Sequence, residues 1–297
     1  MPTLTQPERA RGGLLGLAVA DALGAPLEFA APARAATAVE AGLEMTGGGS
    51  FGWLPGEWTD DTTMALCLAE SIGAHGLLDL DDVTRRYADW ASSGPKDIGN
   101  ATSAALRGAS SAAEAREQAR TYVERTGSGA GNGTIMRAAP IGLAASSLAE
   151  AVDAARADAV LTHGDARAGH ASAALCGALL SLDEPLPAAR AECAGEPKLL
   201  EALDADAAEL AALAANQTGA CWTALGVAMH ALTEIDDYER GVLWAISLGG
   251  DTDTNAAVAG ALLGARHGVE AIPKRWLDVL RRRDRIEAAA ASLVAIR

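Results

Sequence analysis

Apolar residues recur along most of the chain at the three- and four-residue spacing of amphipathic helices, interrupted by glycine, proline and serine. No linker of different composition and no fixed-period repeat divides the chain, so residues 1–297 are expected to form one compact all-α domain. The stretch 190–215 is also expected to be helical, without defined boundaries. The other predicted helices, about a dozen in total, cover residues 9–24, 61–75, 80–93, 98–114, 134–146, 148–158, 165–182, 217–233, 237–248, 253–267 and 273–295.

Composition favours helices over strands, and the charge argues against one class of ligand. Aromatic residues, which are common in strands, make up 4% of the chain, whereas alanine, the best helix former, is abundant. The formal net charge of -15 argues against binding of a nucleic-acid backbone by a broad basic face. A small anionic ligand is still compatible with this charge, because helix N-termini and bound metals supply positive potential locally.

The cysteines and the N-terminal segment bear on the cellular compartment. None of the four cysteines belongs to a CxxC pair, so we expect buried thiols in a reducing cytoplasm, with neither a disulfide framework nor a zinc site. Arg9 and Arg11 precede an apolar run as in a signal peptide, but Asp21 interrupts that run. No run approaches the ~20 apolar residues that span a bilayer. We therefore expect a cytoplasmic monomer that does not enter membranes.

Two glycine-rich segments, residues 43–58 and 126–133, interrupt the regular helical pattern. Ordering such loops loses much conformational entropy, so a packing or ligand-binding role is expected for them. A plain connection between helices is the alternative.

Two clusters of threonine and aspartate stand where helices are predicted to begin. The sequence Thr59-Asp60-Asp61-Thr62 opens one helix, and Asp251-Thr252-Asp253-Thr254, after two glycines, opens another. Helix capping is the simpler explanation for either cluster alone, because threonine and aspartate suit an N-cap. Capping needs only one such residue, however, and adjacent carboxylates repel each other unless a cation lies between them.

The recurrence of these clusters towards opposite ends of the chain favours a metal site. Two helix N-termini that face each other can supply oxygen ligands from both sides. Carboxylate and hydroxyl oxygens are hard ligands, which suit Mg²⁺ or Mn²⁺ better than zinc. An EF-hand is excluded, because its spacing of acidic residues and its terminal glutamate are missing.

Three further features are candidates for ligand contacts. Asp97 directly precedes a predicted helix, where it is either an N-cap or a functional carboxylate. The turn Gly131-Asn132-Gly133 runs into the predicted helix 134–146, an arrangement that suits a phosphate bound by backbone N–H groups. This turn lacks the Walker lysine and the Rossmann strand context. His163 stands at a helix start and is equally compatible with packing and with function.

Together these residues resemble the ADP-ribosylglycohydrolase family, whose members include ADP-ribosylarginine hydrolases. The combination of TDDT, GNGxxMR and GGDTDT is far more specific than any one of these motifs. The matching stretches occur in the family's order over nearly the whole chain: Leu15–Phe29, Met45–Gly48, Thr59–Thr62, Asp97–Asn100, Gly131–Arg137, Thr162–Gly164 and Gly249–Asn255.

The resemblance implies an orthogonal helical bundle around two Mg²⁺ or Mn²⁺ ions. It implies Glu28, Asp97 and Asp61 as catalytic residues. For adenine stacking no motif aligns, and Trp53 and Tyr122 are the candidates. The implied metal ligands are Thr59, Asp60, Asp61, Asp251, Asp253 and Thr254, and the implied substrate contacts are Asp97, Gly99, Asn100, Gly131, Asn132, Gly133, Thr134, Met136 and His163.

The resemblance also implies the reaction, hydrolysis of the glycosidic bond between ADP-ribose and a modified protein side chain. Arginine is the expected side chain. Cleavage at the anomeric carbon develops oxocarbenium character, two metals would orient the ribose and acidify a water, and Glu28 or Asp97 would handle the proton. Hydrolysis of serine-linked or other O-linked ADP-ribose, a non-catalytic ADP-ribose-binding protein and a two-metal phosphoesterase remain the alternatives.

Overall fold

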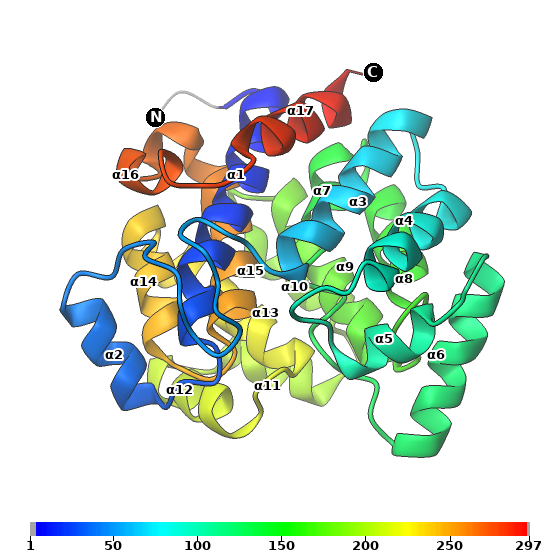
Figure 1. The fold of residues 1–297 in the computed structure, drawn as a ribbon, viewed down its shortest axis with the longest axis horizontal. Helices are drawn as coiled ribbons and strands as arrows, with labels where there is room; N and C mark the ends of the chain where they lie inside the picture. Colours follow the sequence, from blue (N-terminus) through cyan, green and yellow to red (C-terminus); the bar gives the residue numbers. More distant parts are fainter. Residues whose placement is uncertain (1–3, 296–297) are drawn as a thin grey trace.

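Helix α1 (Gln6–Gly24) packs along α15 (Thr252–His267) at the centre of the molecule (Figure 1). Glycines on both helices bring the backbones into contact. A Cβ atom added to Gly12 would lie 2.1 Å from the carbonyl oxygen of Gly264, and one added to Gly16 would lie 2.3 Å from that of Gly260. The contacts move from Gly12 to Gly16 along α1 and from Gly264 to Gly260 along α15, so the two helices are antiparallel. The C-terminal end of α1 therefore lies beside the N-terminal end of α15, where the second acidic cluster begins.

The other helices surround this central pair. The structure, a computed structural model, describes residues 4–295, which form seventeen α-helices and no strands, so the all-α prediction is confirmed. Helices α13, α14 and α17 pack against the central pair, and α3 packs against α17 (Figure 1). The remaining bounds are α2 (Pro32–Glu40), α3 (Asp60–His75), α4 (Leu80–Ser92), α5 (Asn100–Leu106), α6 (Ala112–Thr126), α7 (Ala139–Ala144), α8 (Leu148–Ala159), α9 (Ala166–Leu180), α10 (Pro185–Glu192), α11 (Pro197–Asp204), α12 (Ala207–Asn216), α13 (Cys221–His230), α14 (Tyr238–Ser247), α16 (Lys274–Leu277) and α17 (Arg283–Val294).

Some predicted helices are divided at single residues. The prediction of one helix over residues 98–114 is wrong, because Gly108 adopts φ +68° and separates α5 from α6. Ser111 then caps α6 by accepting a hydrogen bond from the backbone N–H of Glu114. The predicted helix 134–146 contains only α7, since Pro140 has no N–H to continue a helical ladder from the preceding turn.

Proline also explains most of the other differences. Helix α2 was not predicted, although Pro32 stands at its first position, where a missing N–H is tolerated. The stretch 190–215 holds parts of three helices, α10 to α12, of which two begin at Pro185 and Pro197. The predicted helix 273–295 is divided into α16 and α17 by Arg282, which adopts φ +49°.

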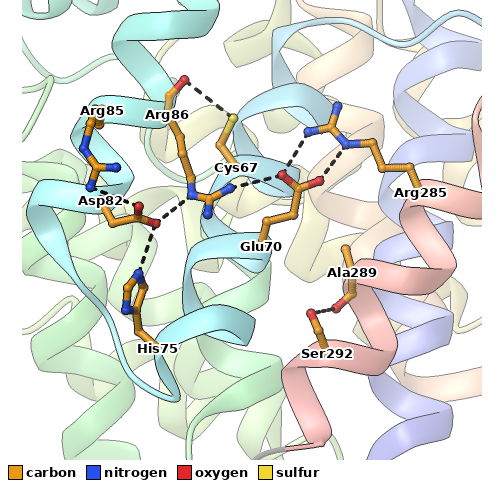
Figure 2. A network of polar contacts seen from close by, with 9 residues as sticks. All are labelled: Cys67, Glu70, His75, Asp82, Arg85, Arg86, Arg285, Ala289 and Ser292. Atoms are coloured by element: carbon orange, nitrogen blue, oxygen red, sulfur yellow. Dashed lines mark hydrogen bonds and ion pairs between the residues drawn. The ribbon is translucent and has the colours of Figure 1, made fainter.

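An ion-pair network connects the middle of α3 to α4 and α17 (Figure 2). Glu70 on α3 accepts hydrogen bonds from Arg285 on α17, the shorter at 2.6 Å, and lies 3.5 Å from Arg86 on α4. Arg86 also donates a 2.6 Å hydrogen bond to Asp82. Helix α3, which carries the first acidic cluster at its N-terminus, is thus held from two sides.

No helix within residues 4–295 is both long enough and apolar enough to cross a lipid bilayer.

Candidate active site

A carboxylate on α1 holds the first acidic cluster. Asp21 is fully buried and accepts hydrogen bonds from the backbone N–H groups of Thr59 (3.0 Å) and Thr62 (3.0 Å) and from the Thr62 hydroxyl (2.5 Å). Burial raises the pKa of Asp21 to about 6, although these hydrogen bonds act in the opposite direction. Asp21 therefore occupies the position of an anion at the N-terminus of α3, supplied by another helix.

The N-termini of α3 and α15 meet at a direct hydrogen bond. The Thr59 hydroxyl caps α3 by accepting a 3.2 Å hydrogen bond from the backbone N–H of Asp61. The Asp61 carboxylate is buried, and its Oδ1 accepts a 3.1 Å hydrogen bond from the Thr254 hydroxyl on α15. The two acidic clusters, far apart in the sequence, thus form one group of oxygen atoms.

The second cluster does not cap its helix with a side chain. Asp251 stands at the N-cap of α15, but its side chain caps no backbone N–H. Its Oδ2 instead accepts a 2.9 Å hydrogen bond from the side-chain amide of Asn132, which aims the carboxylate towards the glycine-rich turn. The preceding Gly250 adopts φ +72°, and its carbonyl accepts a 2.7 Å hydrogen bond from the backbone N–H of Phe29. This contact ties the segment after α1 to the start of α15.

These elements enclose a cavity of about 360 Å³, within the range of ligand pockets. Glu28, Asp97 and Asp253 each offer a carboxylate oxygen, and the three oxygens lie within 4.8 Å of one another. The cavity is lined by Glu28, Phe29, Asp60, Asp97, Gly99, Asn100, Ala101, Thr102, Tyr122, Ser128, Gly129, Gly131, Asn132, Gly133, Met136, His163, Gly219, Asp251, Asp253 and Thr254.

The crowded carboxylates disfavour one another's charge. Burial, together with the charges of Asp97 and Asp251, raises the pKa of Glu28 to about 9. Burial and neighbouring carboxylates likewise raise the pKa values of Asp61 and Asp253 well above their ordinary range. A cation between these groups would offset their mutual repulsion and favour the ionised carboxylates.

Unsatisfied oxygen atoms test whether the site suits divalent cations. Glu28 Oε2, Asp61 Oδ2 and Asp253 Oδ1 are buried and have no hydrogen-bond partner among residues 4–295. Buried carboxylate oxygens are costly to leave unpaired. Hard oxygen donors from several carboxylates match the preference of Mg²⁺ and Mn²⁺, so these residues fit the expected metals.

A histidine ring supports the turn Gly131-Asn132-Gly133. A Cβ added to Gly133 would lie 2.9 Å from His163 Cε1, and one added to Gly131 would lie 3.0 Å from His163 Nε2. Burial and then the charge of Arg137 lower the pKa of His163 to about 3, so its ring is neutral near neutral pH. The ring lines the cavity and lies against both glycines of the turn.

The buried side chain of Arg137 fixes this arrangement from behind. Its Nη1 donates to the Gly133 carbonyl (3.0 Å) and to the Thr162 hydroxyl (2.9 Å), and its Nε donates to Asp158 (2.8 Å). The Thr162 hydroxyl in turn lies 2.9 Å from His163 Nδ1. One cation thus anchors both the turn and the histidine that packs on it.

Most of the residues expected at the site line the cavity, and three do not. Thr59 and Asp61 are buried outside the lining, where Thr59 caps α3 and Asp61 contacts Thr254. Thr134 is also buried outside it, and its hydroxyl donates to the carbonyl of Ala168 (3.1 Å). The structure gives the Thr134 side chain a packing role, because its hydroxyl is directed to α9.

The two candidate aromatic residues lie in different places. Tyr122 lines the cavity, whereas Trp53 is buried outside it and packs against Phe51 at a centroid distance of 5.8 Å. Sequence reasoning did not single out Phe29, which lines the cavity, or Asp21. For Asp21 a signal existed, a carboxylate within the apolar run of α1.

Comparison with known proteins identifies the family and the fold of the chain. Residues 2–297 match the family model for ADP-ribosylglycohydrolase, and the chain belongs to this family. A solved structure described as an ADP-ribosylglycohydrolase-related protein complex superposes with a TM-score of 0.77 at 34% sequence identity, covering 98% of each chain.

Two curated relatives are similar in sequence to nearly the whole chain. The ADP-ribosyl-[dinitrogen reductase] glycohydrolase of Rhodospirillum rubrum is 32% identical over 278 residues, which are 92% of this chain and 90% of that protein. The ADP-ribosylarginine hydrolase Tri1 of Serratia proteamaculans is 32% identical over 308 residues, covering 99% of this chain and 81% of the relative.

Proposed function

We propose that this protein hydrolyses the N-glycosidic bond that joins ADP-ribose to an arginine side chain of a modified protein. The observation that carries the proposal is the cavity in which Glu28, Asp97 and Asp253 converge beside a glycine-rich turn. The names of the two relatives above, one specifying ADP-ribosylarginine, support arginine as the linkage. The four buried, unpaired cysteines favour a reducing compartment, so we place the activity in the cytoplasm.

The residues that would hold two divalent ions are those at the facing ends of α3 and α15. They are Thr59, Asp60, Asp61, Asp251, Asp253 and Thr254. Bound Mg²⁺ or Mn²⁺ would supply positive charge that orients the ribose hydroxyls and makes water more acidic. The unpaired oxygens of Asp61 and Asp253 support this assignment.

The carboxylates of the cavity suit the charge changes of the reaction. A water oxygen forms a bond to the anomeric carbon while the bond to the guanidine nitrogen breaks, and positive charge develops on the ribose. Negative carboxylates beside the ribose stabilise that charge. Glu28 and Asp97 are the candidates to accept the proton of the water and return one to the leaving nitrogen.

The remaining contacts would hold the ADP-ribose. The backbone N–H groups of Gly131 and Gly133 suit the pyrophosphate, whereas that of Asn132 donates to the Gly219 carbonyl (2.9 Å). The neutral ring of His163 lies against both glycines. Gly99, Asn100 and Met136 line the same cavity and would contact the nucleotide or the ribose. The side chain of Tyr122 is the aromatic lining residue available to the adenine.

Product analysis with three defined substrates tests the proposal. Arginine-, serine- and O-acyl-linked ADP-ribose are incubated with the protein in Mg²⁺, Mn²⁺ or EDTA, and the products are identified by mass spectrometry. We expect intact ADP-ribose from the arginine-linked substrate, and its loss with EDTA or with Asp253→Asn. The exposed substitution Asp278→Asn is the matched control.

Each other result has a defined meaning. Release of ADP-ribose from the serine-linked substrate alone would mean that the protein cleaves a hydroxyl linkage and not an arginine linkage. AMP and ribose phosphate would indicate a phosphoesterase. Binding of ADP-ribose by the metal-loaded protein without any release would indicate a non-catalytic relative.

A further inference from the structure

The side chain of Phe29 is unusual in its exposure. The residue is 61% exposed, and it is the only aromatic among the exposed large hydrophobic residues within 4–295. It also lines the cavity and directly follows Glu28 in the sequence. An isolated exposed apolar residue is common on protein surfaces. A phenyl ring that lines a polar cavity, in contrast, is placed to contact a bound ligand.

The backbone of Phe29 shows that its position is enforced. Phe29 adopts φ +63°, a conformation that bulky side chains rarely take and that glycine takes without strain. Two hydrogen bonds with Gly250 hold the segment, one donated by the Phe29 N–H (2.7 Å) and one accepted by the Ala30 carbonyl (3.0 Å). The contact that ties this segment to the start of α15 therefore also fixes the ring beside the cavity.

The neighbours of the ring leave much of its surface open. Phe51 lies at a centroid distance of 6.4 Å with its plane tilted by 58°, and Phe51 in turn contacts Trp53. The ammonium group of Lys96 lies 5.0 Å from the centroid of Trp53. The rings of Phe29, Phe51 and Trp53 thus form a row that runs from the cavity to the ammonium group of Lys96.

The chemistry of the ring matches one leaving group better than the others. A guanidinium is a planar, delocalised cation that stacks on aromatic faces, and nearby carboxylates strengthen its binding. A serine hydroxyl has no positive charge and no planar group that could stack on the ring. Phe29 lines the same cavity as Glu28, Asp97 and Asp253, where the glycosidic bond would be cut, and it is exposed to solvent.

We propose that the exposed ring of Phe29 is a specificity-determining contact that stacks on the guanidinium of arginine-linked ADP-ribose and so favours arginine over hydroxyl linkages. This inference rests on the proposed hydrolysis of ADP-ribosylarginine. It adds the residue that distinguishes an arginine linkage from a hydroxyl linkage.

The test compares Phe29→Leu, which keeps an apolar side chain but removes the ring, with Phe29→Tyr, which keeps the ring. The ratio of kcat/KM for arginine-linked to serine-linked ADP-ribose is measured for each. We expect Phe29→Leu to lower this ratio by roughly 10-fold, as expected for loss of one cation–π contact, and Phe29→Tyr to preserve it. Leu54→Ala, a change at another exposed apolar residue that lies outside the cavity lining, is the control.

A second measurement separates recognition of the guanidinium from damage to the site. Inhibition constants are determined for Nα-acetylarginine amide and for ADP-ribose, and thermal unfolding is recorded for every variant. Phe29→Leu is expected to weaken inhibition by the arginine compound more than inhibition by ADP-ribose.

Equal losses for both substrates and both inhibitors, or no change in either ratio, would overturn the role of Phe29. The wild-type protein decides the underlying function by itself. If it releases no ADP-ribose from the arginine-linked substrate, the proposed function fails and this inference fails with it. If it does release ADP-ribose and Phe29→Leu behaves like wild type, only the inference fails.

Discussion

The hydroxyl group of Thr254 donates a 3.1 Å hydrogen bond to Oδ1 of Asp61, 193 positions earlier in the chain. This bond joins the two acidic clusters directly. The other oxygen of Asp61 has no partner among residues 4–295 and remains available for a cation. Thr254 thus orients a buried carboxylate whose second oxygen is free.

Removal of the Thr254 hydroxyl should weaken metal binding. In Thr254→Val the shape is kept, but Asp61 loses its hydrogen bond and the site loses a hydroxyl oxygen proposed as a metal ligand. Loss of a group that orients a ligand typically lowers metal affinity about 10- to 100-fold. Calorimetric titration with Mn²⁺ and Mg²⁺ measures the change, and Thr254→Ser should restore most of the affinity. Wild-type affinity in Thr254→Val would contradict this prediction, and Thr37→Val on the surface of α2 is the control.

Removal of the Asp21 carboxylate should destabilise the fold. In Asp21→Ala, the buried N–H groups of Thr59 and Thr62 and the Thr62 hydroxyl lose their acceptor. Losing hydrogen bonds to a charged group lowers the free energy of unfolding by about 2 kcal/mol. Urea unfolding near neutral pH measures the change. Asp278→Ala, which removes an exposed ion pair with Lys274, should change stability by less than about 0.5 kcal/mol. Equal effects of the two substitutions would rule out a special role for Asp21.

A methyl group between the central helices should impair both stability and activity. In Gly264→Ala the new Cβ would lie 2.2 Å from the Gly12 carbonyl oxygen, so α1 and α15 must separate. Such overpacking costs about 1–3 kcal/mol, and separation moves Glu28 away from Asp253. In the control Gly177→Ala on α9, the nearest atom is 3.5 Å away, and the higher helix propensity of alanine should raise stability by up to ~1 kcal/mol. Thermal unfolding and ADP-ribose release are measured for both, and similar behaviour of the two variants would refute the backbone contact.

The network around Asp82 should make stability depend on acidic pH (Figure 2). Burial opposes ionisation of Asp82, but its hydrogen bond and ion pair with Arg86 outweigh this and lower the pKa from 3.8 to about 2. Because the folded-state pKa is below the unfolded-state pKa, ionised Asp82 stabilises the fold above a pH of about 4, and this contribution is lost as the pH falls towards 2.

Asp82→Asn isolates this contribution. It should lower the free energy of unfolding by about 2 kcal/mol near neutral pH. Urea unfolding across the acidic range should show the wild-type and variant curves converging as the pH approaches 2. A constant difference at every pH would mean that the loss comes from packing and not from the charge.

The class of fold could be predicted from the sequence, whereas several helix boundaries could not. Apolar periodicity continues across short breaks, so it predicts α5 and α6 as one helix that runs through Gly108. The capping pair of Ser111 and Glu114 was the local signal for a new helix. Pro32 and Pro140 gave equally local signals, but a proline marks either the start or the interruption of a helix, and only packing decides between them.

The residues of the site were predictable where they occupy a contiguous motif. Two aspartate–threonine clusters and a glycine turn are visible in the sequence because each is local. Asp21 acquires its role only when α1 packs against the start of α3, and Phe29 only when Gly250 fixes its backbone. The side-chain direction of Thr134 depends on α9, which lies beyond any local pattern.

The glycine contacts between α1 and α15 have a consequence for redesign of the enzyme. Gly24, four residues before Glu28, lies against the backbone of Thr252 and Asp253, so main-chain contact brings the segments that carry the two carboxylates together. Phe29, which lines the cavity, and Phe51, which contacts its ring, belong in contrast to connecting segments outside the α-helices. A library that aims at a new linkage should therefore vary these segments and leave the glycines of the central helices untouched.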